Sequence, residues 1–180
     1  MVYVFLADGF EEIEALTPVD LMRRAGIETL TVGVTGRTVT GAHGIAVTAD
    51  VTADAVDLKE AEMIVLPGGA PGYLNLEASD FVQSAVDACV AMGRYIAAIC
   101  AAPTILGRKG LLKGRRATCY PGMEGELEGA AFTEDSVACD GRFITSRGVG
   151  TAIDFALKLI ETLTDGETAR RIGASICHKG

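Results

Sequence analysis

The chain of 180 residues, 49% of them apolar, is long enough to bury one substantial core, and we expect a single domain over residues 1–180. The 16 Lys and Arg against 24 Asp and Glu give a net charge of -8, which disfavours binding to nucleic acid or to an anionic membrane surface. The longest apolar runs span six to eight residues, far short of the about 20 that a transmembrane helix needs.

The first expected strand, VYVFLA, follows Met1 without a positively charged segment and runs into acidic residues, which is unlike a signal peptide. The five cysteines form no C-x-x-C pair, so neither a disulfide framework nor a zinc knuckle is indicated. We therefore expect a cytoplasmic protein with reduced thiols and with no cofactor or metal.

A helix follows this strand, and Thr17 and Pro18 are typical of a helix start, as N-cap and first helical residue. The acids before them would then lie in a separate helical turn. We expect Glu11 and Glu12 to be solvated or to lie near a helix dipole. Glu14, flanked by apolar residues, is expected to point inward, where a carboxyl group must be paired or protonated.

Short β-rich runs alternate with helical patterns along the rest of the chain. Because the strands are apolar nearly throughout, they predict an α/β fold with a mostly parallel central sheet and helices on both faces. Residues 37–50 predict a β-ribbon, and residues 126–142 a further short strand pair. Ligands bind outside the C-terminal ends of the strands in such sheets, so the strand ends are where chemistry is sought. The β-rich runs are VYVFLA, TLTVGV, IAVTA, MIVLPGG, YIAAIC, RATCY and FITSRG.

Two glycines, Gly68 and Gly69, follow the strand MIVL within VLPGGAPG. Glycine allows backbone conformations that turn an amide toward a pocket, as an oxyanion hole requires. A plain strand-to-helix turn explains the pair equally well. A phosphate-binding loop is disfavoured, because no Lys-Ser/Thr follows.

Cys100 lies in YIAAICAAPTIL, between a strand and a helix expected to run to about Arg108. A nucleophile elbow needs small residues two positions before and two after the nucleophile, here Ala98 and Ala102, and Pro103 suits the first turn of the helix. The helix dipole at such a position lowers a thiol pKa from about 8.5 into a range of roughly 3.5 to 7.5. We interpret Cys100 as a reactive thiolate, with a packed core thiol as the alternative.

The last core strand, within FITSRGVGTAIDFAL, is followed by Arg147, which can add positive charge near the pocket. Ser146 lacks the glycine two positions before it that a serine elbow prefers, so a serine hydrolase is disfavoured. The glycines that follow open the last long helix.

No histidine follows a core strand, and we expect both His43 and His178 to be surface residues. Glu14 is left as the expected neighbour of Cys100. A carboxylate would repel a thiolate, whereas a protonated carboxyl group donates a hydrogen bond to it. We therefore expect the two groups to share one proton, with the negative charge mainly on sulfur.

Four motifs in order resemble the DJ-one branch of the ThiJ/PfpI superfamily: LADGFEEIEALTPVDLMRRAG, VLPGGAPG, AAICAAPTIL and ITSRGVGTAIDFALKLIE. The resemblance implies a flavodoxin-like three-layer sandwich and a homodimer whose interface uses the first helix region. It also implies a reactive Cys100, a functional Glu14, and oxyanion amides at Gly69 and Ala101. Family members include redox-sensing stress proteins and cofactor-free glyoxalases or deglycases that act on methylglyoxal and its adducts; some relatives are peptidases or chaperones.

The chain departs from the family at Tyr120, where many relatives carry a histidine close to the cysteine. With an ordinary pKa of about 10, tyrosine is a poor base at neutral pH, which disfavours a Cys-His peptidase. His43 falls about where the family's human member has an arginine facing the site. Cys119 is either a second oxidisable thiol near the pocket or a strand-end cysteine without a role.

Two functions from different classes remain open. In the first, Cys100, assisted by Glu14, acts on a small aldehyde as a glyoxalase or deglycase. In the second, the protein is a non-enzymatic redox sensor or chaperone in which peroxide oxidises Cys100 to sulfinic acid. Both need the same reactive thiol.

Overall fold

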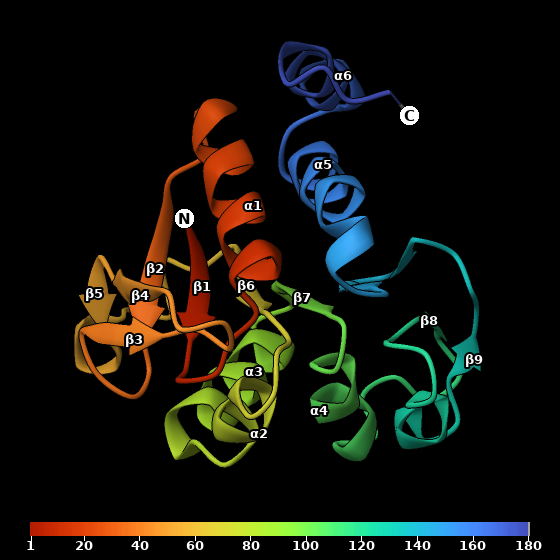
Figure 1. The fold of residues 1–180 in the computed structure, drawn as a ribbon. Coiled ribbons are helices and arrows are strands. Elements are labelled where there is room, and N and C mark those ends of the chain that lie inside the picture. Colours follow the sequence, from red (N-terminus) through yellow and green to blue (C-terminus); the bar gives the residue numbers. More distant parts are fainter. Residues whose placement is uncertain (180) are drawn as a thin grey trace.

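The computed structural model describes residues 1–179, which form a central sheet with helices on both faces (Figure 1). Neighbouring strands of the sheet are parallel, except for one antiparallel strand at an edge. The predicted α/β class with a mostly parallel sheet is therefore confirmed. In spatial order the strands are β10 (Val137–Asp140), β11 (Phe143–Ser146), β7 (Tyr95–Ile99), β6 (Met63–Leu66), β1 (Val2–Leu6), β2 (Thr29–Gly33) and β5 (Val51–Thr52).

Helices cover both faces of this sheet (Figure 1). One layer holds α1 (Glu12–Arg24), α5 (Ala152–Leu163) and α6 (Gly166–Ser175), and the other holds α2 (Gly72–Glu77), α3 (Asp80–Ala91) and α4 (Pro103–Arg108). Successive residues of a strand point to opposite faces, and the neighbours Val4 and Phe5 belong to different apolar clusters, both fully buried. This is why the strands are apolar throughout.

The first helix differs from the prediction. It begins at Glu12, with no separate turn before it, and Pro18 lies inside it rather than at its first turn. The buried residues Ala15 and Val19 are four positions apart, so one apolar stripe crosses the proline. We attribute the continuous helix to the packing of this stripe, which compensates for the backbone hydrogen bond that proline cannot make.

The smaller strands confirm the ribbon but not the second strand pair. β3 (Thr38–Thr40) and β4 (Ala46–Thr48) form an antiparallel ribbon within residues 37–50. In the region 126–142, β9 (Ala131–Phe132) pairs instead with β8 (Arg116–Ala117), and β10 joins the main sheet. The run RATCY therefore contributes to a small separate sheet. Three short 3-10 turns complete the fold: η1 (Ala53–Ala55), η2 (Glu124–Leu127) and η3 (Val149–Thr151). No helix within residues 1–179 is long and apolar enough to cross a membrane.

Candidate active site

Cys100 occupies a strained turn between β7 and α4, as an elbow requires. Its φ angle of 65° lies in the left-handed region that residues with side chains rarely adopt. The turn is fixed by two backbone hydrogen bonds: Cys100 N–H donates to Ser146 O at 2.9 Å, and Tyr120 N–H donates to Cys100 O at 2.8 Å. Ala98 and Ala102 are fully buried on either side, so larger residues have no room there. The thiol itself is only half-buried, which leaves it open to small reagents.

Glu14 points inward from the first turn of α1 and is fully buried. Its Oε2 accepts a hydrogen bond from Gly68 N–H at 3.0 Å, whereas its Oε1 has no hydrogen-bond partner among residues 1–179. Burial raises the pKa of Glu14 to about 7, and the charge of Glu11 adds to this, while hydrogen bonds with Cys100 and Gly68 oppose it. The carboxyl group is therefore poised to gain or lose a proton near neutral pH.

The two glycines after β6 let the thiol and the carboxyl group meet. A Cβ atom on Gly68 would lie 2.6 Å from both Cys100 Cβ and Glu14 Oε2, closer than atoms can approach. Gly69 has a φ of +90°, and a Cβ atom there would lie 2.2 Å from Glu11 N. A side chain at Gly68 would push the thiol and the carboxyl group apart, and a side chain at Gly69 would collide with the backbone of residues 9–11. These close contacts favour the interpretation that Gly68 and Gly69 shape the site, over the alternative of a plain strand-to-helix turn.

The pKa of the Cys100 thiol does not follow the expectation of a low value. Burial raises it to about 12, and the neighbouring charge of Glu14 adds to the rise, while hydrogen bonds from the Ala101 and Gly69 amides lower it. The helix α4 has only six residues, so its dipole is small beside these effects. The thiol and the carboxyl group form a coupled pair, which gives up one proton near neutral pH and holds the second into the alkaline range.

Gly148 completes the wall of the site and was missed as a site residue. A Cβ atom on it would lie 3.5 Å from Tyr120 Cδ2, 3.7 Å from Glu14 Oε1 and 3.9 Å from Cys100 Sγ. The structure thus brings Tyr120 to the rim of the site, with its side chain about half exposed. The sequence marked residue 148 only as part of a helix start, because a glycine without a side chain gives no chemical signal.

Arg147 and Cys119 lie to one side of the pair. The charge of Arg147 lowers the pKa of Cys119, but burial and Glu124 outweigh it and raise that pKa to about 11. The Cys119 thiol is fully buried and donates to Tyr120 O at 3.5 Å. A neutral, enclosed thiol of this kind fits the interpretation of Cys119 as a residue without a redox role.

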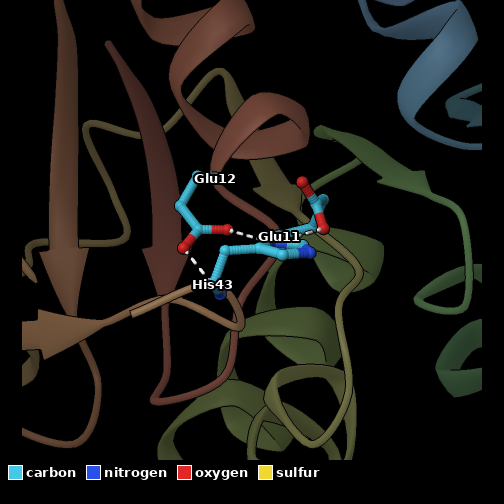
Figure 2. Close-up of side chains that lie close together, drawn as sticks. All are labelled: Glu11, Glu12 and His43. Atoms are coloured by element: carbon cyan, nitrogen blue, oxygen red, sulfur yellow. Dashed lines mark hydrogen bonds and ion pairs between the residues drawn. The ribbon is translucent and has the colours of Figure 1, made fainter. Parts of the chain in front are cut away.

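His43 faces two acids at the N-terminus of α1. Its Nδ1 lies 2.9 Å from Glu12 Oε2 and 3.4 Å from Glu11 Oε2, as Figure 2 shows. Of the two expected alternatives for Glu11 and Glu12, solvation is wrong, because they are only 9% and 5% exposed, whereas a position near a helix dipole agrees with their place at the N-terminus of α1. His178, the other histidine, pairs with Asp154 at 3.0 Å. Neither imidazole is therefore placed to act as a base for Cys100.

The chain is similar to known proteins over nearly its whole length. A sequence model of the DJ-1/PfpI family matches residues 1–162. The chain is 36% identical to Protein dj-1beta of Drosophila melanogaster, over 96% of this chain and 94% of that protein. It is 34% identical to the glutathione-independent glyoxalase DJR-1.2 of Caenorhabditis elegans, over 93% and 90% of the two chains. Among solved structures, oxidized DJ-1 of Toxoplasma gondii superposes with a TM-score of 0.95 at 36% identity, covering 99% of this chain and 98% of that one.

Proposed function

Because the chain belongs to the DJ-1/PfpI family, we propose that it converts small dicarbonyls such as methylglyoxal into hydroxy acids, with Cys100 as nucleophile and Glu14 as proton carrier. The observation that carries the proposal is the fully buried Glu14 carboxyl group, whose free Oε1 borders the same small space as the Cys100 sulfur. The relative in Caenorhabditis elegans that is named a glutathione-independent glyoxalase supports the choice of reaction.

The first step forms a bond between sulfur and the aldehyde carbon. The coupled pair holds one proton at neutral pH, which resides on either Glu14 or Cys100. The Ala101 and Gly69 amides donate to the sulfur and stabilise the thiolate, but burial and the charge of Glu14 outweigh them, so the form with a thiolate and a protonated carboxyl group is the minor, reactive one. As the thiolate attacks, the carbonyl electron pair moves to oxygen, which takes the Glu14 proton and gives a hemithioacetal. In this proposal the same two amides hold that oxygen while charge develops on it.

The later steps return every group to its starting state. Glu14, now a carboxylate, removes the hydrogen from the former aldehyde carbon as a proton and delivers it to the neighbouring carbon, while the hydroxyl proton passes to the oxygen on that neighbouring carbon, so that the hemithioacetal becomes a thioester. Water then adds to the thioester carbon, the C–S bond breaks, and the hydroxy acid leaves as the thiol is regenerated. Methylglyoxal and one water thus give lactic acid with no external oxidant or reductant.

The experiment that tests this function measures lactate formed from methylglyoxal by the full chain. Cys100→Ser should abolish it, and Cys119→Ser, a matched change at a buried thiol, should leave it within about twofold. The proposal fails if the unsubstituted chain forms no lactate, or if Cys100→Ser retains the activity after repurification.

A redox sensor is the second candidate, and the half-buried thiol favours it. One peroxide would oxidise the thiolate to a sulfenate with loss of water, and a second would give the sulfinate, which the Glu14 proton would stabilise by a hydrogen bond. Gain of two oxygen atoms at Cys100 under mild peroxide, without lactate formation, would select this function. A Cys-His peptidase remains disfavoured, because both histidines pair with acids elsewhere.

We further propose a homodimer in the cytoplasm. The apolar side chains of Ile13, Ile45 and Ile153 are 50%, 54% and 38% exposed, and all three line a hollow with Leu16 on the outer face of α1. A second copy of the chain would cover this face. Ile13→Glu should convert the dimer into a monomer, as measured by light scattering. All five cysteines are free, which suits a reducing compartment.

A further inference from the structure

Glu11, Glu12 and His43 form a cluster outside the thiol site (Figure 2). One ligand atom from each residue lies within 4.8 Å of the other two. The acids come from the start of α1, and the histidine comes from the turn between β3 and β4. No local sequence pattern indicates this group, because 31 residues separate Glu12 from His43.

The turn is shaped around the Glu12 carboxylate. His43 N–H donates to Glu12 Oε1 at 2.9 Å, and Ile45 N–H donates to the same oxygen at 3.4 Å. A Cβ atom on Gly41 would lie only 2.3 Å from Oε1, so the backbone there approaches as closely as glycine permits. These amides hold Oε1 and leave Oε2 free to face the imidazole. The fold thus fixes both the carboxylate and the ring before any ligand arrives.

Glu11 lacks a matching set of donors. It is only 9% exposed, yet its carboxylate accepts no hydrogen bond within residues 1–179 and contacts only His43 Nδ1, at 3.4 Å. That nitrogen carries at most one hydrogen, and Glu12 lies closer to it, at 2.9 Å. No lysine or arginine within residues 1–179 forms an ion pair with either acid. Two nearly buried carboxylates therefore face one imidazole, which compensates at most one of their charges.

The spacing of the ligand atoms suits a small cation. Tetrahedral bonds of about 2.0–2.1 Å place neighbouring ligand atoms about 3.3 Å apart. The distances from His43 Nδ1 to the two carboxylate oxygens, 2.9 and 3.4 Å, bracket this value. The cluster opens into a hollow of about 400 Å³, and the imidazole side chain is 69% exposed, so water can complete the coordination.

We propose that Glu11, Glu12 and His43 bind a divalent first-row transition-metal ion of the zinc type. An imidazole nitrogen with two carboxylate oxygens is a donor set that zinc accepts, whereas magnesium and calcium prefer oxygen alone. The site is separate from the proposed reaction and does not depend on it, since Cys100→Ser removes the nucleophile and leaves all three ligands in place.

The test is calorimetric titration with zinc chloride. The full chain carries Cys100→Ser and Cys177→Ser, because thiolates bind zinc. Cys100 is the half-buried thiol of the candidate active site, and Cys177 is exposed. We expect one zinc ion per chain, and about tenfold or greater weakening in Glu11→Gln and in His43→Gln. His178→Gln is the matched control, because that histidine also pairs with a carboxylate but only with one, and it should leave the affinity unchanged. Light scattering on the same samples separates zinc binding from association at the neighbouring α1 face.

A second measurement needs no substitution in the cluster. Co²⁺ added to the same chain should shift and broaden the amide signals of His43 and Ile45 before those around His178. The proposal is wrong if zinc does not bind saturably, if His43→Gln binds it as well as the parent chain does, or if His178→Gln loses as much affinity as His43→Gln. Cobalt effects centred on His178 would also overturn it.

Discussion

Glu12 and Glu14 lie two residues apart on the same helix and are both buried, yet their pKa values move in opposite directions. Burial raises the pKa of Glu14 to about 7, and its single backbone donor does not prevent this. Burial acts on Glu12 in the same sense, but the His43 side chain and the backbone amides of His43 and Ile45 outweigh it and lower the pKa. Glu14 lies deeper in the fold and has fewer donors than Glu12, and the two differences together decide that Glu14 is the carboxyl group that keeps a proton.

The comparison separates two uses of a buried acid. A carboxyl group with too few donors near a nucleophile can carry a proton at neutral pH, which suits Glu14 to acid–base chemistry. A carboxylate surrounded by donors stays charged and suits the binding of a cation. One helix turn therefore serves two different sites, and each can be changed without removing the other.

The largest expected effect comes from replacing Glu14, and it is an effect on turnover. Glu14→Gln keeps the shape of the side chain but removes its ability to exchange a proton, so lactate formation from methylglyoxal should fall by about 10²–10⁴-fold in kcat/KM. Glu28→Gln, at an exposed position, is the control and should change it by less than about twofold. Equal activity of the Glu14 variant and the control would show that Glu14 does not transfer the proton.

The next effect is on the pH dependence of stability. Because the pKa of Glu14 is raised in the folded state from 4.5 to about 7, its contribution to stability is fully present below pH 4.5 and is lost as the pH rises through about 7. The unsubstituted chain should thus lose about 2.5 kcal/mol of unfolding free energy from this group between pH 5 and pH 8. Glu14→Gln should remove that part of the slope.

Urea unfolding at the two pH values, with a chelator present, measures the difference between the two chains. The result does not depend on whether sulfur or oxygen keeps the last proton, since the coupled pair loses one proton in either case. Parallel pH profiles for the two chains would mean that Glu14 titrates at its ordinary value.

A smaller effect is expected at Glu12, where removal of the carboxylate destabilises the fold. Glu12→Ala leaves the backbone amides of His43 and Ile45 without their partner and should destabilise the fold by about 2 kcal/mol at pH 7. Glu28→Ala is the control, expected within about 0.5 kcal/mol. Urea unfolding measures both, and a Glu12 variant as stable as the control would show that water replaces the acceptor without cost.

The fold could be predicted from sequence because its signals are local. Apolar runs such as VYVFL and MIVL marked strands of the parallel sheet, and these two lie where they were expected, whereas RATCY joined a small separate sheet. The start of α1 was predicted wrongly, because Pro18 is a strong local signal and the packing that outweighs it is not visible in the sequence. The partners of β8, β9 and β10 were missed for a similar reason, since short strands pair according to the surrounding fold.

The site could be predicted in part. The elbow at Cys100 has a steric signature in its flanking alanines, and the inward turn of Glu14 follows from its apolar neighbours. The wall formed by Gly148 and the pairing of His43 with Glu12 depend on which loops meet in space. The pKa of Cys100 was expected to fall because the dipole is visible in the sequence, whereas the extent of burial that outweighs it is not.

The smallest expected effect is on His43 and tests the Glu12 side of the comparison directly. A hydrogen bond with Glu12 and the charges of Glu11 and Glu12 raise the pKa of His43 above its ordinary value. Glu12→Gln should lower that pKa more than Glu11→Gln does, because it removes the hydrogen bond to a charged partner as well as a charge. The ring is exposed, so solvent screens both effects and keeps them small. Titration of the His43 ring protons by NMR, in the presence of a chelator, measures both. Equal changes in the two variants would mean that the pKa of His43 depends only on the total charge of the two acids, and that the hydrogen bond with Glu12 adds nothing to it.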